Sequence, residues 1–154
     1  MDDSMERRIR GLEDREMIRE LTATYCFMVD DGRYDELVDL HFTDDATCDF
    51  RTRTGNLGPF VAQGAEEVRT FFKVTVANML RDMSHTVHNH RITVEGELAS
   101  GECYFELTAV DTASGAQIVG AGRYIDRYRS VEDRWRFEQR NADIFHLVPL
   151  AQGW

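Results

Sequence analysis

Lysine, cysteine and long apolar runs are scarce in this chain of 154 residues, and each shortage argues against a class of function. The one lysine, Lys73, has no sequence context typical of a Schiff-base enzyme. The three cysteines, Cys26, Cys48 and Cys103, are far apart and odd in number, so they show neither a metal-ligand spacing nor a disulfide framework. We therefore expect reduced thiols, no metal site and a cytoplasmic protein.

Further absences concern membranes, nucleic acids and cofactors. No segment approaches the roughly 20 apolar residues that a membrane span needs, and the start of the chain has no apolar stretch typical of a signal peptide. Eighteen basic against 28 acidic residues give a net charge of −10, the wrong sign for binding nucleic acid or anionic lipid. A glycine-rich phosphate-binding loop is also missing. The sequence thus predicts no nucleic-acid partner, no membrane partner and no cofactor.

Length and periodicity indicate one domain over residues 1–154 with helices at its start. The hydrophobic content of 42% and the charged content of 30% are ordinary for a globular protein. Apolar residues at helical spacing predict helices over residues 4–30 and 33–42. A third helix should begin after Gly64, with Phe72 on its buried face.

Strand patterns dominate the rest of the chain. Short strands are expected over residues 46–51 and 60–63, followed by four long strands between residues 85 and 148. The intervening turns are expected at Glu95–Glu97, Ser114–Gly115 and Val131–Asp133. Because long antiparallel strands must twist and curl, the predicted fold class is α+β. It is a cone-shaped α+β barrel, in which three N-terminal helices pack on a strongly curved antiparallel sheet and enclose a pocket.

Three of the five histidines, His85, His88 and His90, lie within six positions at the start of the first long strand. The pKa of a histidine lies near neutrality, so this side chain serves as general acid, general base or metal ligand. Regular alternation places His85 on one face and the other two on the opposite face, but a bulge would reverse the assignment of the residues before it. The sequence leaves open which histidine faces the pocket.

Three segments carry a resemblance to a known family. They are LEDREMIRELTATYCFMVDDGRYDELVDLHFTDDA, HTVHNHRITVEGELASG and GRYIDRYRSVEDRWRFEQR. Together with the order of helices and strands, they resemble the SnoaL-like branch of the nuclear transport factor 2-like superfamily over nearly the whole chain. That resemblance implies the cone-shaped fold, but it does not fix one activity. The family includes dehydratases, isomerases, polyketide cyclases, an epoxide hydrolase, small dioxygenase subunits and ligand binders without catalytic activity.

Within this family the motifs are most similar to those of scytalone dehydratase and the bile-acid 7α-dehydratase. The resemblance implies three catalytic residues: Tyr25 on the first helix, Asp30 five residues later, and His85 at the start of the third strand. The second acid–base residue of those enzymes falls at Leu107, which cannot transfer a proton. This departure argues against a straightforward dehydratase.

The last strand offers candidates for substrate binding. If Trp135 and Phe137 face the core, regular alternation places Asn141 and Asp143 on the same face and Arg140 in solvent. Buried polar groups need partners, and a polar ligand would supply them. The alternative is that the strand has left the core by residue 141. The predicted substrate contacts are Phe72, His88, Asn141 and Asp143.

The sequence predicts a cofactor-independent lyase (dehydratase) or isomerase that uses His–Asp acid–base chemistry on a small, apolar, partly oxygenated molecule. Two other hypotheses remain open: a small structural subunit of a ring-hydroxylating dioxygenase, and a non-catalytic ligand-binding module. Val119, Ala121 and Ile125 add apolar surface to the outer face of the predicted sheet, which favours a homodimer or homotrimer through that face. The apolar tail over residues 146–154 is expected to take part.

Overall fold

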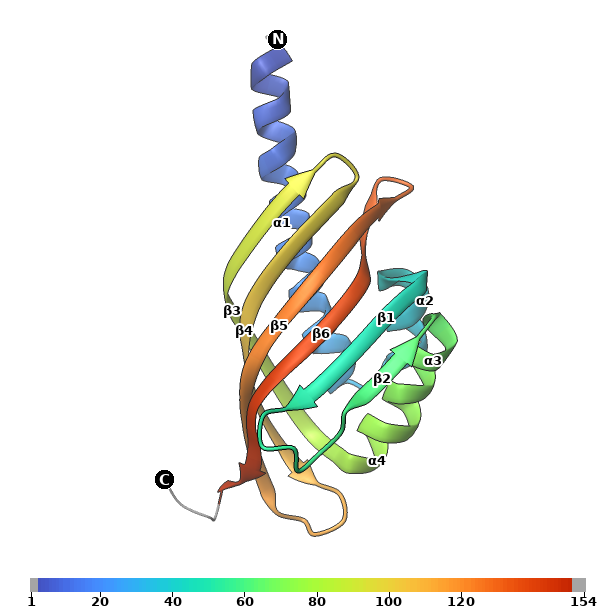
Figure 1. Cartoon of the computed structure of the whole chain (residues 1–154), viewed down its shortest axis with the longest axis vertical. Coiled ribbons are helices and arrows are strands. Elements are labelled where there is room, and N and C mark those ends of the chain that lie inside the picture. Colours follow the sequence, from blue (N-terminus) through green and yellow to red (C-terminus); the bar gives the residue numbers. More distant parts are fainter. Residues whose placement is uncertain (1–2, 151–154) are drawn as a thin grey trace.

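The computed structural model describes residues 3–150, which fold as helices packed on one face of a twisted sheet (Figure 1). The predicted first and second helices are confirmed as α1 (Asp3–Asp30) and α2 (Tyr34–His41). Gly32, with a φ of +70°, allows the chain to turn sharply between them, and the backbone N–H of Arg33 donates to the carbonyl of Met28 at 2.8 Å. This left-handed position explains why glycine ends the first helix.

The predicted third helix is confirmed, and its middle has an unexpected geometry. It runs without a break through α3 (Ala65–Thr70), η1 (Phe71–Val76) and α4 (Ala77–Met79). The η1 segment is a π-helix, whose wider turns are rare and often lie at functional sites. Phe72 at its start is 1% exposed, as the predicted buried face requires.

Six strands form one sheet in the order β2-β1-β6-β5-β4-β3. They are β1 (Phe42–Thr52), β2 (Phe60–Gln63), β3 (Leu80–Glu95), β4 (Leu98–Asp111), β5 (Gln117–Val131) and β6 (Arg134–Pro149). The expected antiparallel pairing is correct except between β1 and β6, which run parallel. These two strands are separated in sequence by the third helix and three long strands, so no tight turn forces them to run in opposite directions. The sheet is therefore mixed and open, with β2 and β3 at its edges.

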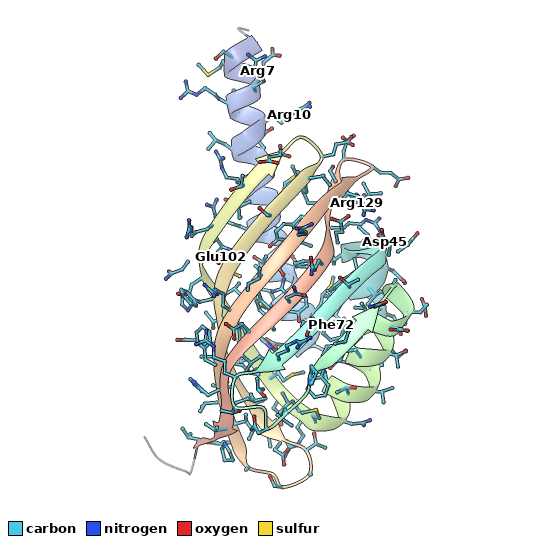
Figure 2. The ribbon with its side chains drawn as sticks, viewed as in Figure 1. Arg7, Arg10, Asp45, Phe72, Glu102 and Arg129 are labelled. Atoms are coloured by element: carbon cyan, nitrogen blue, oxygen red, sulfur yellow. The ribbon has the colours of Figure 1, made fainter. Side chains whose placement is uncertain are left out.

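The two faces of the sheet differ sharply in chemistry. The face toward the helices holds the core, and Trp135 ties α1 to it by donating its indole N–H to the carboxylate of Asp14 at 2.9 Å. The outer face carries charged side chains such as Glu102 and Arg129 (Figure 2). Arg129 binds the carboxylate of Asp45 at 3.1 Å and thereby links β5 to the start of β1. Any buried ligand site must therefore lie between the helices and the inner face.

A bulge in β3 decides the orientation of the clustered histidines. The register with β4 shifts between His88 and Arg91, where Asn89 has a φ of +56°. Before the bulge the odd-numbered His85 points inward, and after it the even-numbered Ile92 does so. The bulge that the sequence left open is therefore present, and His88 lies on the outer face.

A second bulge, in β6, overturns the predicted alternation of that strand. Phe137 pairs with Tyr128 while Gln139 pairs with Arg127, so one residue is extra between them. From Arg140 to Ile144 the inward side chains are even-numbered, and Arg140 is buried with 0% exposure. The prediction that Arg140 faces solvent while Asn141 and Asp143 face the core is therefore wrong.

Candidate active site

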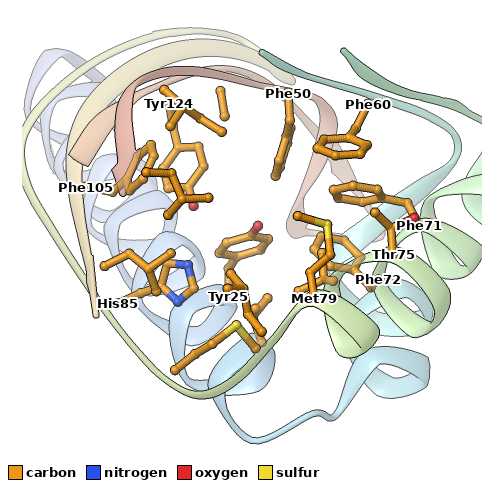
Figure 3. A pocket seen from close by; sticks show the side chains of 18 residues that line it. Tyr25, Phe50, Phe60, Phe71, Phe72, Thr75, Met79, His85, Phe105 and Tyr124 are labelled. Atoms are coloured by element: carbon orange, nitrogen blue, oxygen red, sulfur yellow. The ribbon is translucent and has the colours of Figure 1, made fainter. Parts of the chain in front are cut away.

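An apolar cavity of about 80 Å³ lies between the helices and the inner face of the sheet (Figure 3). Side chains from α1, η1, α4 and all six strands line it, and five of them are phenylalanines. These are Phe50, Phe60, Phe71, Phe72 and Phe105. The titratable side chains among the lining residues are Tyr25, His85 and Tyr124. The cavity thus combines a hydrophobic interior with very few groups that can move a proton.

Asp30 and His85 form a closely joined pair at one side of this cavity. One carboxylate oxygen of Asp30 lies 2.5 Å from Nδ1 of His85, and the other accepts the backbone N–H of His85 at 2.9 Å. The side chains are 17% and 7% exposed respectively. With Nδ1 engaged, Nε2 is the ring nitrogen left for a ligand, and no described residue occupies it. The pair has the geometry of a carboxylate that orients an imidazole base.

The position of Asp30 explains why it needs His85. It is the last residue of α1, where the helix dipole disfavours a carboxylate. Two donors from one residue of β3 compensate for that unfavourable field and also join the end of α1 to the sheet. The structure therefore joins Asp30 and His85, which the family resemblance had implied as partners, although they are 55 positions apart in sequence.

Tyr25 from α1 and Tyr124 from β5 meet in one wall of the cavity. Tyr25 is 1% exposed, and its ring meets the rings of Phe72, Tyr124 and Phe137 edge-on at 5.7–6.0 Å. Burial raises the pKa of Tyr25 well above its ordinary value, and the neighbouring Tyr124 adds to that rise. Each hydroxyl therefore stays protonated and can act as a hydrogen-bond donor, but not readily as an acid.

Arg140 packs against the rings of the two tyrosines inside the core, although the alternation pattern had predicted that it faces solvent. The guanidinium of Arg140 stacks on Tyr25 at 3.9 Å and on Tyr124 at 3.6 Å from the ring centroids. Its Nη1 donates to Asp126 at 3.3 Å, and both side chains are 0% exposed. Burial works to lower the pKa of Arg140, but attraction to Asp126 and the tyrosines keeps it well above the ordinary value. A permanent positive charge therefore backs this wall of the cavity.

Three predicted substrate contacts do not line the cavity. His88 lies on the outer face near Tyr104, with ring centroids 6.0 Å apart. Asp143 accepts two hydrogen bonds from Arg53 at 2.7 and 2.9 Å, and this pairing lowers the pKa of its carboxyl group. Asn141 faces outward beside it, so the two bulges explain all three misplacements. Of the four predicted contacts, Phe72 does line the cavity.

The sequence does contain a signal for these two bulges, because the apolar residues change between odd-numbered and even-numbered positions along each strand. In β6 the apolar side chains change from odd to even numbers, since Phe137 is followed by Ala142 and Ile144. In β3 the same change occurs between Val87 and Ile92. A break in the parity of apolar residues marks an extra residue in a half-buried strand.

Leu107 lies directly opposite His85 on the neighbouring strand, where a second acid–base residue was sought. Its neighbours Glu106 and Thr108 are exposed on the outer face, so neither supplies an acid–base group to the cavity. Within residues 3–150, moreover, no group of three histidine, cysteine, aspartate or glutamate side chains is placed to hold a metal ion. None of the helices in that range has the length and apolar character needed to cross a lipid bilayer.

Comparison with known proteins places this geometry in context. The model of the SnoaL-like domain matches residues 10–141. An uncharacterized protein of Mycobacterium tuberculosis is 29% identical over 135 residues, which is 86% of each chain. A structure of an NTF2-like protein with a cystatin-like fold from Novosphingobium aromaticivorans is 27% identical, with a TM-score of 0.70 over 94% of this chain and 91% of that one.

Two further structures share the fold at lower identity. LinA is 23% identical, with a TM-score of 0.80 over 91% of both chains. A protein of Novosphingobium aromaticivorans provisionally named scytalone dehydratase is 19% identical, with a TM-score of 0.74 over 97% of this chain and 91% of that one. These likenesses confirm the expected α+β fold with three N-terminal helices.

Proposed function

The chain belongs to the SnoaL-like family, and from that premise we propose that it is a lyase that performs an elimination on a small neutral ring compound. The observation that carries the proposal is the pair of hydrogen bonds by which Asp30 holds His85 at the wall of an apolar cavity. In this proposal Nε2 of His85 removes a proton from a substrate carbon. The C–H electron pair becomes the new double bond, and the leaving group departs from the adjacent carbon with its own electron pair.

Asp30 supports the proton transfer in two ways. Its carboxylate fixes the ring orientation of His85, and it stabilises the imidazolium that forms once the proton is taken. A positioned general base contributes about 10²–10⁴-fold to the rate of such a step. Tyr25, which also lines the cavity, would donate a hydrogen bond to an electronegative atom of the substrate as negative charge develops there.

The missing second acid favours a leaving group that departs as a stable anion. Loss of water requires a proton donor for the hydroxyl, but Leu107 stands opposite His85 and the raised pKa of Tyr25 makes it a weak acid. A halide needs no such proton. A structural neighbour from Novosphingobium barchaimii, 21% identical with a TM-score of 0.76 over 91% of this chain and 92% of that one, is named a hexachlorocyclohexane dehydrochlorinase. Elimination of chloride is therefore the form of the reaction that we favour over dehydration.

The lining also restricts the substrate class. A carboxylate or phosphate on the substrate would be buried among phenylalanines with no cation lining the cavity, which costs several kcal/mol. The flat aromatic walls suit a ring. We therefore propose a neutral, apolar, six-membered ring as the substrate class.

Chloride release and water loss from a panel of neutral chlorinated and hydroxylated ring compounds test the proposal. The wild type should release chloride from at least one compound, and His85→Ala should reduce that rate by about 10²–10⁴-fold. Asp30→Asn should reduce the rate of chloride release by less than His85→Ala does. His88→Ala changes a residue on the outer face and should keep the wild-type rate. Undiminished turnover by His85→Ala would exclude His85 as the base. Tight binding without turnover would instead favour a ligand-binding module, and co-purification with a larger iron–sulfur protein would favour a dioxygenase subunit.

A further inference from the structure

A surface groove lies directly behind one wall of the cavity. It has a volume of about 380 Å³ and runs between β2 and the third helix. Three residues, Phe60, Phe71 and Thr75, line both the groove and the internal cavity. Two hollows that share the same side chains are separated by those side chains alone, so this wall is one side chain thick.

The two phenyl rings in the shared wall come from different elements, Phe60 from β2 and Phe71 from η1. Phe60 pairs with Phe50 in the sheet and packs against the backbone of Gly58, where a Cβ would lie 3.3 Å from its ring. Phe71 starts the π-helical segment and meets Phe60 with ring centroids 5.8 Å apart. Its neighbour Phe72 is 1% exposed among the rings of Tyr25, Tyr34 and Phe42, whereas Phe71 is only half-buried. Phe71 also contacts the rings of Phe50 and Phe72, each at 5.1 Å, so it is not free of neighbours. Its place on a π-helical segment, outside the sheet that holds Phe60, makes it the ring of this wall that a local change of the helix would move.

The size of the cavity requires such a movement. A cavity of 150 Å³ lined by apolar side chains accepts benzene. At about 80 Å³ this cavity is roughly half that size, so a substituted six-membered ring enters only if a wall gives way. Rotation of Phe71 into the groove would both enlarge the cavity and open a path from the surface. Val61 and Val74, each 55% exposed, add apolar surface to the groove, which Glu67 and Thr70 also line.

We infer that the groove between β2 and η1 is the entrance to the cavity, and that Phe71 is the gate whose rotation sets the largest ring admitted. The identity of the molecule that passes rests on the proposed function, but the path itself does not. The occupant of the groove is a small neutral apolar molecule on its way to His85. Specificity for ring size then resides in Phe71 and Thr75 rather than in the catalytic pair.

A thiol placed inside the cavity tests the path without any substrate. Leu107→Cys adds a thiol to the cavity lining, and the natural cysteines are 5% exposed or less and outside that lining. Methyl methanethiosulfonate, a small neutral reagent, labels the new thiol, and peptide mass spectrometry gives the rate at that site. Phe71→Ala in this background should raise the labelling rate by about tenfold or more, because the gate is removed. Thr75→Trp should lower the rate by filling the shared wall.

The matched control is Phe105→Ala, which deletes the same atoms from a cavity wall that does not face the groove. Its labelling rate should stay within about threefold of the background, with unfolding free energies measured for every variant. Should either alanine variant fail to fold, Phe71→Leu and Phe105→Leu replace the pair. If both substitutions accelerate thiol labelling equally, or if the change at Phe71 does not accelerate it, the groove is not the entrance to the cavity. Because no elimination is measured, these outcomes are independent of whether the proposed reaction is correct.

Discussion

The buried pair of Asp126 and Arg140 allows a sharp prediction about stability. Both side chains are 0% exposed, and Asp126 also accepts the hydroxyl of Tyr128 at 2.9 Å. Asp126→Leu would leave a guanidinium that cannot lose its proton inside the core, at a cost of about 3–5 kcal/mol in unfolding free energy. Arg140→Met would remove the charge from between aromatic rings, where such a contact contributes about 2 kcal/mol when desolvated. The double variant leaves no unpaired charge, so its loss should be about 1–3 kcal/mol smaller than the sum of the two.

The response of the two single variants to pH should differ in a defined direction. Burial raises the pKa of Asp126 to about 6, against the opposing influence of Arg140. Without that cation the folded-state pKa rises further above the unfolded value, so the folded state binds the additional proton. The unfolding free energy of Arg140→Met should therefore recover as the pH falls from 7 to 5, relative to wild type. Asp126→Leu has no group that can neutralise Arg140 and should show no such recovery.

Urea denaturation followed by circular dichroism at pH 7 and pH 5 measures all four proteins of this cycle. Additive single losses, or a loss below about 1 kcal/mol for Asp126→Leu, would show that the guanidinium is not enclosed as described.

Three other outcomes are expected. Phe72→Ala removes a ring that is 1% exposed and should lower the unfolding free energy by about 3–5 kcal/mol; a loss below about 1 kcal/mol would mean that the third helix does not pack there. Burial, then Arg19 and Arg140, lower the pKa of His90, so the unfolded chain takes up its proton first as the pH falls below about 6.5. His90→Asn should therefore lose less unfolding free energy than wild type between pH 7.5 and 5, and an identical loss would contradict this. Light scattering at micromolar concentration should detect a dimer or trimer formed through the outer face of the sheet, where Ile125 is 44% exposed, and a monomer would remove that prediction.

Local pattern in the sequence was sufficient for most elements of the fold. Helical periodicity placed α1 and α2 within one residue at each end, and the strand over Phe60–Gln63 was predicted with its observed bounds. Gly32 marked the end of α1 because only a left-handed turn fits there. These features depend on neighbours within a few residues, which a sequence displays directly.

The candidate site residues fall into two groups, those supplied by the family resemblance and those inferred from alternation along a strand. The resemblance to a family supplied Asp30 and His85, and the structure brings them to 2.5 Å. The roles assigned to Asn141 and Asp143 depended on unbroken alternation through β6, and one extra residue opposite Arg127 and Tyr128 reversed it. Because a bulge reverses the alternation of every residue beyond it, unbroken alternation cannot be assumed along a strand of 16 residues.

The burial of Arg140 could not be predicted from the residues next to it in the sequence. A charged side chain is buried only where partners exist, and its partners come from α1, β5 and β6. The nearest of them in sequence, Phe137, contributes a ring 4.5 Å away, but Asp126 and Tyr25 are distant along the chain. The sequence around residue 140 therefore contains no pattern that predicts a guanidinium enclosed by aromatic rings and Asp126.

The proposed reaction requires His85 to present an unprotonated Nε2 to the cavity, because Asp30 holds the proton on Nδ1. A long-range ¹H–¹⁵N correlation spectrum of the imidazoles, with the signals of His85 assigned through His85→Gln, reports the tautomer directly and needs no substrate. We expect a proton on Nδ1 and none on Nε2 in the neutral ring, with that preference weakened in Asp30→Asn. A neutral His85 that carries its proton on Nε2 would have no free nitrogen facing the cavity, and would contradict its role as the base.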